Sequence, residues 1–183
     1  QGLAREVIQT EKRVNGYELK IDMDCENIFA LYCPVAVDLR FVLAVLKINY
    51  NLERIGDYAE GIARYVITLD APFNENILKE TQLFAMQDKA INMLENAKLS
   101  FEKEDSNKAR TIFKQDETLD IINRYSGNIL YAFVEKDIHY FQEALYIHSI
   151  IQKLERIGDQ ITNIAEEIIF YLEAKVLKHK KEK

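Results

Sequence analysis

The chain has 183 residues, of which 48% are hydrophobic, and a formal net charge of −6. This length and composition suffice for one or two small domains with real cores, and the acidic balance argues against nucleic acid as a partner. The sequence has no run of 18 apolar residues and no apolar leader, so we expect no membrane span. Cys25 and Cys33 lack the spacing of a metal site or a disulfide framework, which favours a cytoplasmic chain.

The first part of the chain predicts two long helices, since it has apolar residues at helical spacing and few turn residues. They cover about 3–32 and 35–69, with a break at Pro34. The second of them is apolar on more than one face, so we expect it to be nearly buried. Because two helices cannot bury such a surface, we expect this part to lack an opening helix or to borrow one from a partner.

The segment 70–74 carries the clearest turn signal and divides the chain into predicted units of 1–71 and 72–183. The second unit is expected to hold three helices, over about 75–102, 108–134 and 139–177. The fold class that follows is all-α.

One hexapeptide, Leu-Glu-Arg-Ile-Gly-Asp, occurs at 52–57 and again at 154–159, a shift of 102 residues (154 − 52). Six identical residues at that separation indicate an internal duplication. Glutamate and aspartate, four apart, lie on one face of each predicted helix. The glycine between them costs roughly 1 kcal/mol relative to alanine in a helix interior, which predicts that something packs close to the backbone there.

The helix before each hexapeptide also carries acids and amides at helical spacing. In the first unit this row is Glu11, Asn15, Glu18 and Asp22, and in the second it is Asp116, Asp120 and Asn123. If the two helices of a unit are antiparallel neighbours, four or more carboxylates converge in each unit.

Converging carboxylates repel one another, and burying one without a partner costs several kcal/mol. A multivalent cation resolves this, and oxygen ligands suit iron(III), manganese, magnesium or calcium. The alternative is that the acids form solvated faces paired with nearby arginines: Arg13, Arg54, Arg124 or Arg156.

No catalytic motif is visible: there is no Glu-x-x-His, phosphate-binding glycine loop, nucleophile elbow or His-Glu-x-x-His. His148 lies seven residues before Glu155 on the same face and is the one candidate for acid–base work, although a structural histidine is the preferred interpretation. A binding module is therefore favoured. A carboxylate-bridged metalloenzyme and a metal-free helical adaptor are the alternatives.

The segment 33–66, which begins Cys-Pro-Val-Ala-Val-Asp-Leu-Arg and ends beyond the first hexapeptide, closely resembles the first-half signature of the PhoU family of phosphate transport regulators. The segment 154–168 is similar to that family's second-half signature. The resemblance covers essentially the whole chain. It implies a tandem pair of antiparallel three-helix bundles, the first without its opening helix in this chain.

The resemblance also implies multinuclear metal clusters, with iron first and zinc, manganese, magnesium or calcium as alternatives. The family's acidic motifs match here at the following residues: Glu18, Asp22, Glu53, Asp57, Asp116, Asp120, Glu155 and Asp159, with Glu11 matching only beside Asn15.

The functional role that the resemblance implies is regulation without catalysis. Such a protein is a cytoplasmic homodimer that restrains phosphate uptake and represses the phosphate-starvation response. It would do so by binding the phosphate transporter ATPase and the sensor histidine kinase, and would reach the membrane only through these partners.

Overall fold

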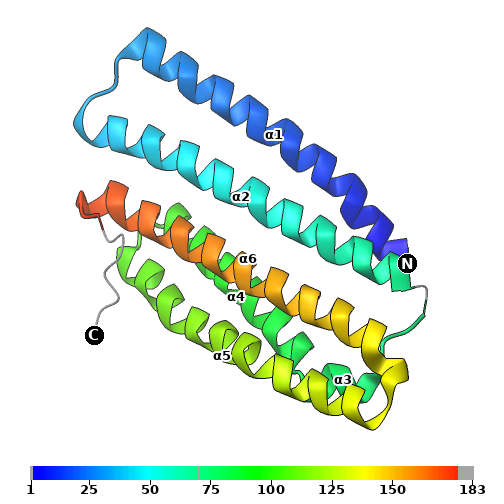
Figure 1. Ribbon diagram of the computed structural model, residues 1–183. Coiled ribbons are helices and arrows are strands. Elements are labelled where there is room, and N and C mark those ends of the chain that lie inside the picture. Colours follow the sequence, from blue (N-terminus) through cyan, green and yellow to red (C-terminus); the bar gives the residue numbers. More distant parts are fainter. Residues whose placement is uncertain (1, 70, 177–183) are drawn as a thin grey trace.

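The structure is a computed structural model that describes residues 2–69 and 71–176, and every regular element in that part of the chain is helical. Figure 1 shows the elements in order: α1 (Gly2–Tyr32), α2 (Ala36–Leu69), α3 (Glu75–Glu80), α4 (Leu83–Glu102), α5 (Ser106–Lys136), the short 3₁₀ turn η1 (Ile138–Tyr140) and α6 (Phe141–Glu173). No helix of the described residues is long and apolar enough to cross a membrane.

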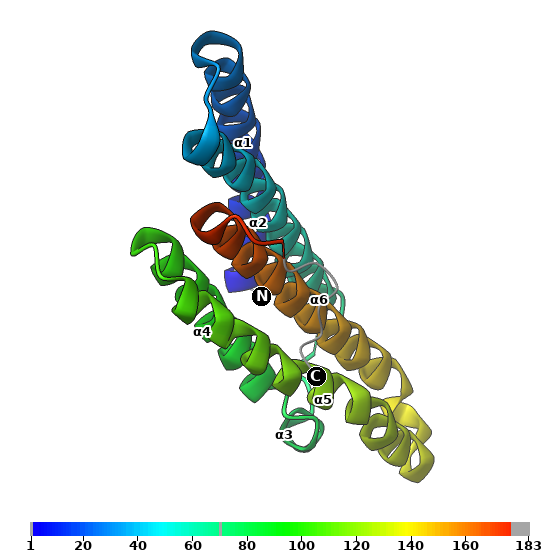
Figure 2. The same cartoon turned by 90° about the vertical axis from the view of Figure 1, so that its left-hand side faces the viewer.

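Helices α2 and α6 run side by side through the middle of the molecule. In both ribbon views α1 lies along α2 on one side, while α4 and α5 lie against α6 on the other (Figures 1 and 2). The main core lies where α4, α5 and α6 pack on one another. Its fully buried side chains include Met86, Met93, Ile112, Leu119, Ile151, Ile161 and Ile168.

The fourth predicted helix is confirmed as α5, which extends two residues further at each end than expected. It begins where the Asp105 side chain accepts a hydrogen bond from the backbone N–H of Lys108 (2.9 Å). This N-cap satisfies one of the free donors at the start of the helix.

The prediction of one continuous helix over 75–102 was wrong, because the chain forms α3 and α4 with a break between them. At the break Gln82 takes a left-handed conformation with φ of 55°. Ile77 and Leu83 are both buried, yet residues six apart lie on different faces of one continuous helix. The turn at Gln82 brings both side chains into the same core.

The last helix is shorter than the predicted 139–177. Asp137 accepts a hydrogen bond from the backbone N–H of His139 (2.9 Å), so the chain first makes η1, and α6 begins at Phe141. The helix ends before Ala174, which has φ of 54°. Position 177 lies outside the described residues.

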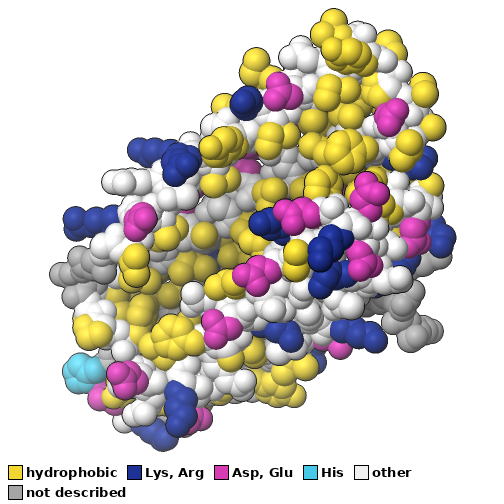
Figure 3. All heavy atoms as spheres, turned by 180° about the vertical axis from the view of Figure 1, so that it is seen from behind, with side chains coloured by type: hydrophobic (Ala, Val, Ile, Leu, Met, Phe, Trp, Pro, Cys, Tyr) yellow, Lys and Arg dark blue, Asp and Glu magenta, His cyan; other side chains and the backbone are white. Residues whose placement is uncertain are grey.

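Helix α2 is less buried than the sequence predicted. Among the described helices α1 and α6 pack along it, and α4 adds a ring contact between Phe101 and Phe41 (5.9 Å between centroids). Several of its large apolar side chains are therefore exposed: Val37, Leu39, Phe41, Tyr50 and Leu52. Figure 3 shows hydrophobic side chains gathered over the end of the molecule where α1 and α2 join. Cys25 is buried, and Cys33 is exposed in the turn between these two helices.

Polar side chains hold α2 against α6. Lys47 Nζ lies 3.1 and 3.0 Å from the two carboxylate oxygens of Glu167, which is 7% exposed. Lys153 Nζ lies over the rings of Tyr58 and Tyr65, 5.8 and 5.7 Å from their centroids. These contacts desolvate one carboxylate and one ammonium at the interface between the two parts of the chain.

We expect Lys47→Ala to lower the free energy of unfolding by about 1–2 kcal/mol, because it leaves the buried Glu167 carboxylate without its cation. Replacing the carboxylate as well, in Lys47→Ala/Glu167→Gln, should recover part of the loss. Urea denaturation measures both values. The exposed pair Lys98–Glu102 is the control, and Lys98→Ala should change stability by less than about 0.5 kcal/mol. Equal losses for Lys47→Ala and Lys98→Ala would contradict the assignment.

Candidate metal centre

The structure brings four acids together between α5 and α6: Asp116, Asp120, Glu155 and Asp159, here called the second cluster. Two come from the acidic row of α5 and two from the hexapeptide on α6. Asp120 and Asp159 are exposed at the rim, whereas Asp116 lies deeper. The convergence predicted from the two rows is therefore present in this half.

Burial is the main influence on the pKa values of these carboxyl groups. It acts with the charges of Asp120, Asp159 and Glu155 to raise the pKa of Asp116 from 3.8 to about 7. Burial and the charge of Asp159 also raise the pKa of Glu155, and burial and Asp120 raise that of Asp159. The negative charges thus disfavour one another's ionisation.

No lysine or arginine in the described part of the chain forms an ion pair with the second cluster. Arg156 offsets only part of the effect on the Glu155 and Asp159 pKa values. The deeper carboxylate oxygen, Asp116 Oδ1, is buried and has no hydrogen-bond partner. The predicted alternative of arginine-paired acids does not describe this half.

The first cluster lies between α1 and α2 and consists of Glu11, Glu18, Glu53 and Asp57, together with Asp22 on the same row of α1. Burial first, and then the charges of Asp57, Glu18 and Glu11, raise the pKa of Glu53. Asn15 belongs to the same row: its Nδ2 donates to the Glu11 carboxylate, while its Oδ1 is buried without a partner.

Here an arginine does contribute. Arg54 Nη1 lies 3.7 Å from the carboxylate of Asp57, and Arg54 Nη2 donates to the Tyr58 hydroxyl at 2.9 Å. Both interpretations of these acids drawn from the sequence therefore apply to the first cluster. Asp57 is paired with Arg54, while the other acids are crowded together.

Asp22 is engaged differently from the rest of its row. Its Oδ1 accepts a hydrogen bond from Asn49 Nδ2 (2.9 Å), which also donates to the backbone carbonyl of Glu18 (2.8 Å). Asn49 is buried, and the sequence reasoning did not select it. The sequence does contain a signal for Asn49. It is the polar member of a row spaced by seven residues, whose other members are apolar or small: Val42, Gly56 and Ala63.

The oxygen donors of these side chains suit a hard cation, but their present arrangement does not surround one. In the described residues no three His, Cys, Asp or Glu side chains are arranged to hold one ion. The donors are nevertheless all oxygens, and each cluster has one buried oxygen without a hydrogen-bond partner, Asn15 Oδ1 and Asp116 Oδ1. A bound cation would have to draw the carboxylates closer together.

His148, the one candidate for acid–base chemistry, is half-buried. Its Nε2 lies 3.1 Å from Gln152 Nε2, and its Nδ1 is buried without a partner. It shares no hydrogen bond or ion pair with Glu155 in the described residues.

We expect the free energy of unfolding of the metal-free protein to fall as pH rises from about 4 to 7. The folded protein keeps a proton on Asp116 that the unfolded chain has released, since the folded pKa is about 7 and the ordinary value is 3.8. Because part of this carboxyl still meets water, the loss should be only about 1–2 kcal/mol. Urea denaturation of chelator-treated protein at several pH values measures it.

Asp116→Asn should remove most of that decline, so that the variant is more stable than wild type at pH 7.5 and similar to it at pH 4.5. Asp88→Asn, at an exposed position on α4, is the matched control. Parallel pH profiles for wild type and Asp116→Asn would show that Asp116 does not hold the proton.

The family model described as the PhoU domain matches this chain over residues 1–66 and 83–168. The phosphate-specific transport system accessory protein PhoU of Edwardsiella tarda is 31% identical over 179 residues, which cover 97% of this chain and 72% of the relative. The protein of the same name from Escherichia coli is also 31% identical over 179 residues, and 73% of it is covered.

Solved structures agree with this relationship. The crystal structure of PhoU from Pseudomonas aeruginosa superposes with a TM-score of 0.89 at 30% identity, covering 95% of this chain and 83% of that one. The phosphate transport system regulatory protein PhoU from Streptococcus pneumoniae gives a TM-score of 0.84 at 28% identity, covering 96% and 81%. The chain therefore has the PhoU fold and belongs to the PhoU family of phosphate transport system accessory proteins.

Proposed function

We propose that this protein is a cytoplasmic negative regulator of phosphate uptake and of the phosphate-starvation response. It acts by binding the ATPase subunit of the phosphate transporter and the sensor histidine kinase, and it approaches the membrane only through them. Support comes from the family relationship, with relatives named as accessory and regulatory proteins of phosphate transport. The described residues also lack a recognisable catalytic constellation, which suits a binding module.

The proposed organisation is a tandem pair of family units, 1–71 and 72–183, that work as a homodimer. The two separate segments matched by the PhoU domain model support the division. The repeated hexapeptide supports it independently, since each copy falls in one of the segments.

We further propose that each cluster binds a multinuclear metal centre, with iron first and zinc, manganese, magnesium or calcium as alternatives. Glu11, Glu18, Asp22, Glu53 and Asp57 would hold the first, and Asp116, Asp120, Glu155 and Asp159 the second. The observation that carries this proposal is the second cluster, in which half-buried carboxylates have no ion-pair partner among the described residues. A bound cation would supply the missing positive charge and fix the two helices of each hairpin relative to each other.

We expect the purified protein to retain metal and each cluster variant, Glu53→Ala/Asp57→Ala or Glu155→Ala/Asp159→Ala, to lose about half of it. Elemental analysis after expression in metal-replete medium measures the content and names the ion. Asp88→Ala/Glu95→Ala, which removes two exposed carboxylates of α4, should keep the wild-type content. An empty wild type whose variants fold equally well would contradict the metal proposal and leave a metal-free helical adaptor.

The regulatory role is tested by binding. The immobilised protein should retain the purified transporter ATPase and the cytoplasmic part of the sensor histidine kinase from the same organism, measured by interferometry. The same proteins passed over an unrelated helical bundle of similar charge give the background. If neither partner binds above that background, with or without added metal, the proposed regulatory mechanism is wrong.

A further inference from the structure

The two identical hexapeptides differ in what faces their glycine. At Gly158, a Cβ atom would lie 2.6 Å from Asp116 Oδ1 and 2.7 Å from Leu119 Cδ2. At Gly56, the nearest atom would be Val14 Cγ1, at 3.4 Å. The first pair of distances is shorter than any side chain accepts, whereas the second is close to ordinary van der Waals contact.

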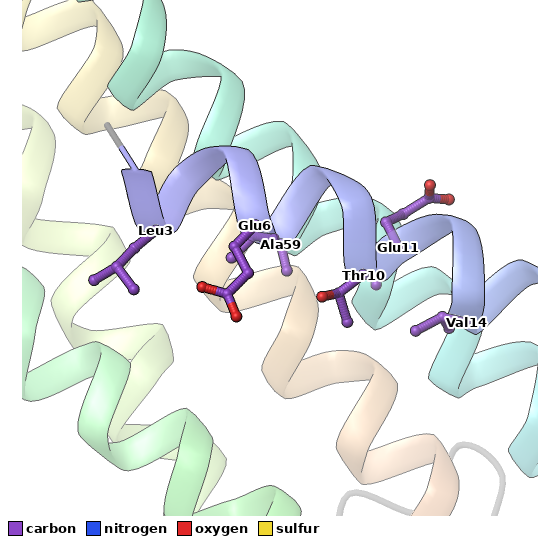
Figure 4. Close-up of a pocket in the computed structure, with 8 residues that line it drawn as sticks. Leu3, Glu6, Thr10, Glu11, Val14 and Ala59 are labelled. Atoms are coloured by element: carbon purple, nitrogen blue, oxygen red, sulfur yellow. The ribbon is translucent and has the colours of Figure 1, made fainter.

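The duplication explains the difference. Shifting by 105 residues (116 − 11 and 119 − 14) makes Asp116 and Leu119 the counterparts of Glu11 and Val14. Valine is smaller than leucine and stands further from its glycine. Figure 4 shows the Glu11 carboxylate pointing away from Val14, and Glu11 is bound by Asn15 instead. Gly56 lies in the wall of an open groove of ≈ 410 Å³, where an added methyl group finds room.

We infer that Gly158 is a positioning residue for the second cluster: the missing side chain lets the Asp116 carboxylate lie directly on the backbone of α6, beside Glu155 and Asp159. Its identical counterpart Gly56 has no such role. This inference rests on the proposed metal function, because it assigns to Gly158 the placement of one metal-ligand side chain.

Asp116 is the group that must yield to a methyl group at position 158. Leu119 is fully buried in the core between α5 and α6, so it has little room to move. The Asp116 side chain is short and half-buried, and its Oδ1 has no hydrogen bond to hold it in place. An added Cβ therefore turns the carboxylate away from α6 or pushes this turn of α5 outward. Either movement separates Asp116 from Glu155 and Asp159.

The experiment isolates the second cluster in the full chain by using a Glu53→Ala/Asp57→Ala background, stripped with a chelator and titrated with Mn²⁺. Free Mn²⁺ is followed by electron paramagnetic resonance, and circular dichroism checks the fold of each variant. We expect Gly158→Ala to weaken Mn²⁺ binding about 10-fold or more, as loss of a ligand-orienting contact does. Gly56→Ala, made in the wild-type background, should leave Mn²⁺ binding unchanged.

A double-mutant cycle separates positioning from general disruption. If Gly158 acts through Asp116, Asp116→Ala and Asp116→Ala/Gly158→Ala should bind Mn²⁺ equally weakly. If the losses of the single variants multiply in the double variant, Gly158 acts on the whole hairpin and the inference is wrong. Unchanged binding in Gly158→Ala also overturns it.

Two controls keep these outcomes distinct. If the unmodified chain binds no Mn²⁺ and holds no other metal, the proposed metal function itself has failed, and the inference falls with it. If Gly158→Ala does not fold, Gly158→Ala/Leu119→Ala replaces it, because that variant removes the apolar part of the contact and keeps Asp116. Compared with Leu119→Ala alone, it should show the same 10-fold weakening, and equal binding by the two overturns the inference.

Discussion

The antiparallel contact between α2 and α6 is the constraint on which the arrangement of both clusters depends. Asn163 donates to Asn51 across it (3.3 Å), and Lys153 covers Gly61. The duplication shift of 102 carries Asn51 onto position 153 and Gly61 onto position 163. Each of these two contacts is therefore the image of the other, and the two copies of the duplicated helix are related by an approximate two-fold axis.

This symmetry directs the two acidic faces away from the shared interface. The faces of α2 and α6 that meet carry lysine, asparagine and tyrosine, and the Glu167 carboxylate there is paired with Lys47. The carboxylates of each hexapeptide instead face the preceding helix of their own hairpin. Each cluster is thus completed within one hairpin, by α1 and α2 or by α5 and α6. The charges of one cluster are kept from those of the other, so repulsion between acids is a problem inside each hairpin and not between them.

Much of this arrangement was readable from the sequence, because it depends on periodicity. Residues that recur every three or four positions predict the all-helical class, the extents of α1, α2 and α5, and the acids that lie near Glu53 and Glu155. The repeated hexapeptide indicates the duplication. The break at Gln82 was not readable, since glutamine is a good helix former and core packing imposes the turn. Nor was the engagement of Asp22 by Asn49, because it depends on how two helices are aligned along their axes.

The two clusters deal with the same electrostatic problem in different ways. In the first, Arg54, Asn15 and Asn49 supply an ion pair and amide hydrogen bonds to Asp57, Glu11 and Asp22. In the second, the deepest carboxylate, that of Asp116, lies against the backbone of Gly158 and the side chain of Leu119. Burial and the neighbouring negative charges raise its pKa to about 7, so Asp116 keeps a proton below that pH. A proton is the weaker substitute for a multivalent cation, because it neutralises one carboxyl group and leaves the other three to repel one another. The hexapeptide is identical in the two copies while the helix facing it differs, so the second hairpin is left with the larger uncompensated negative charge.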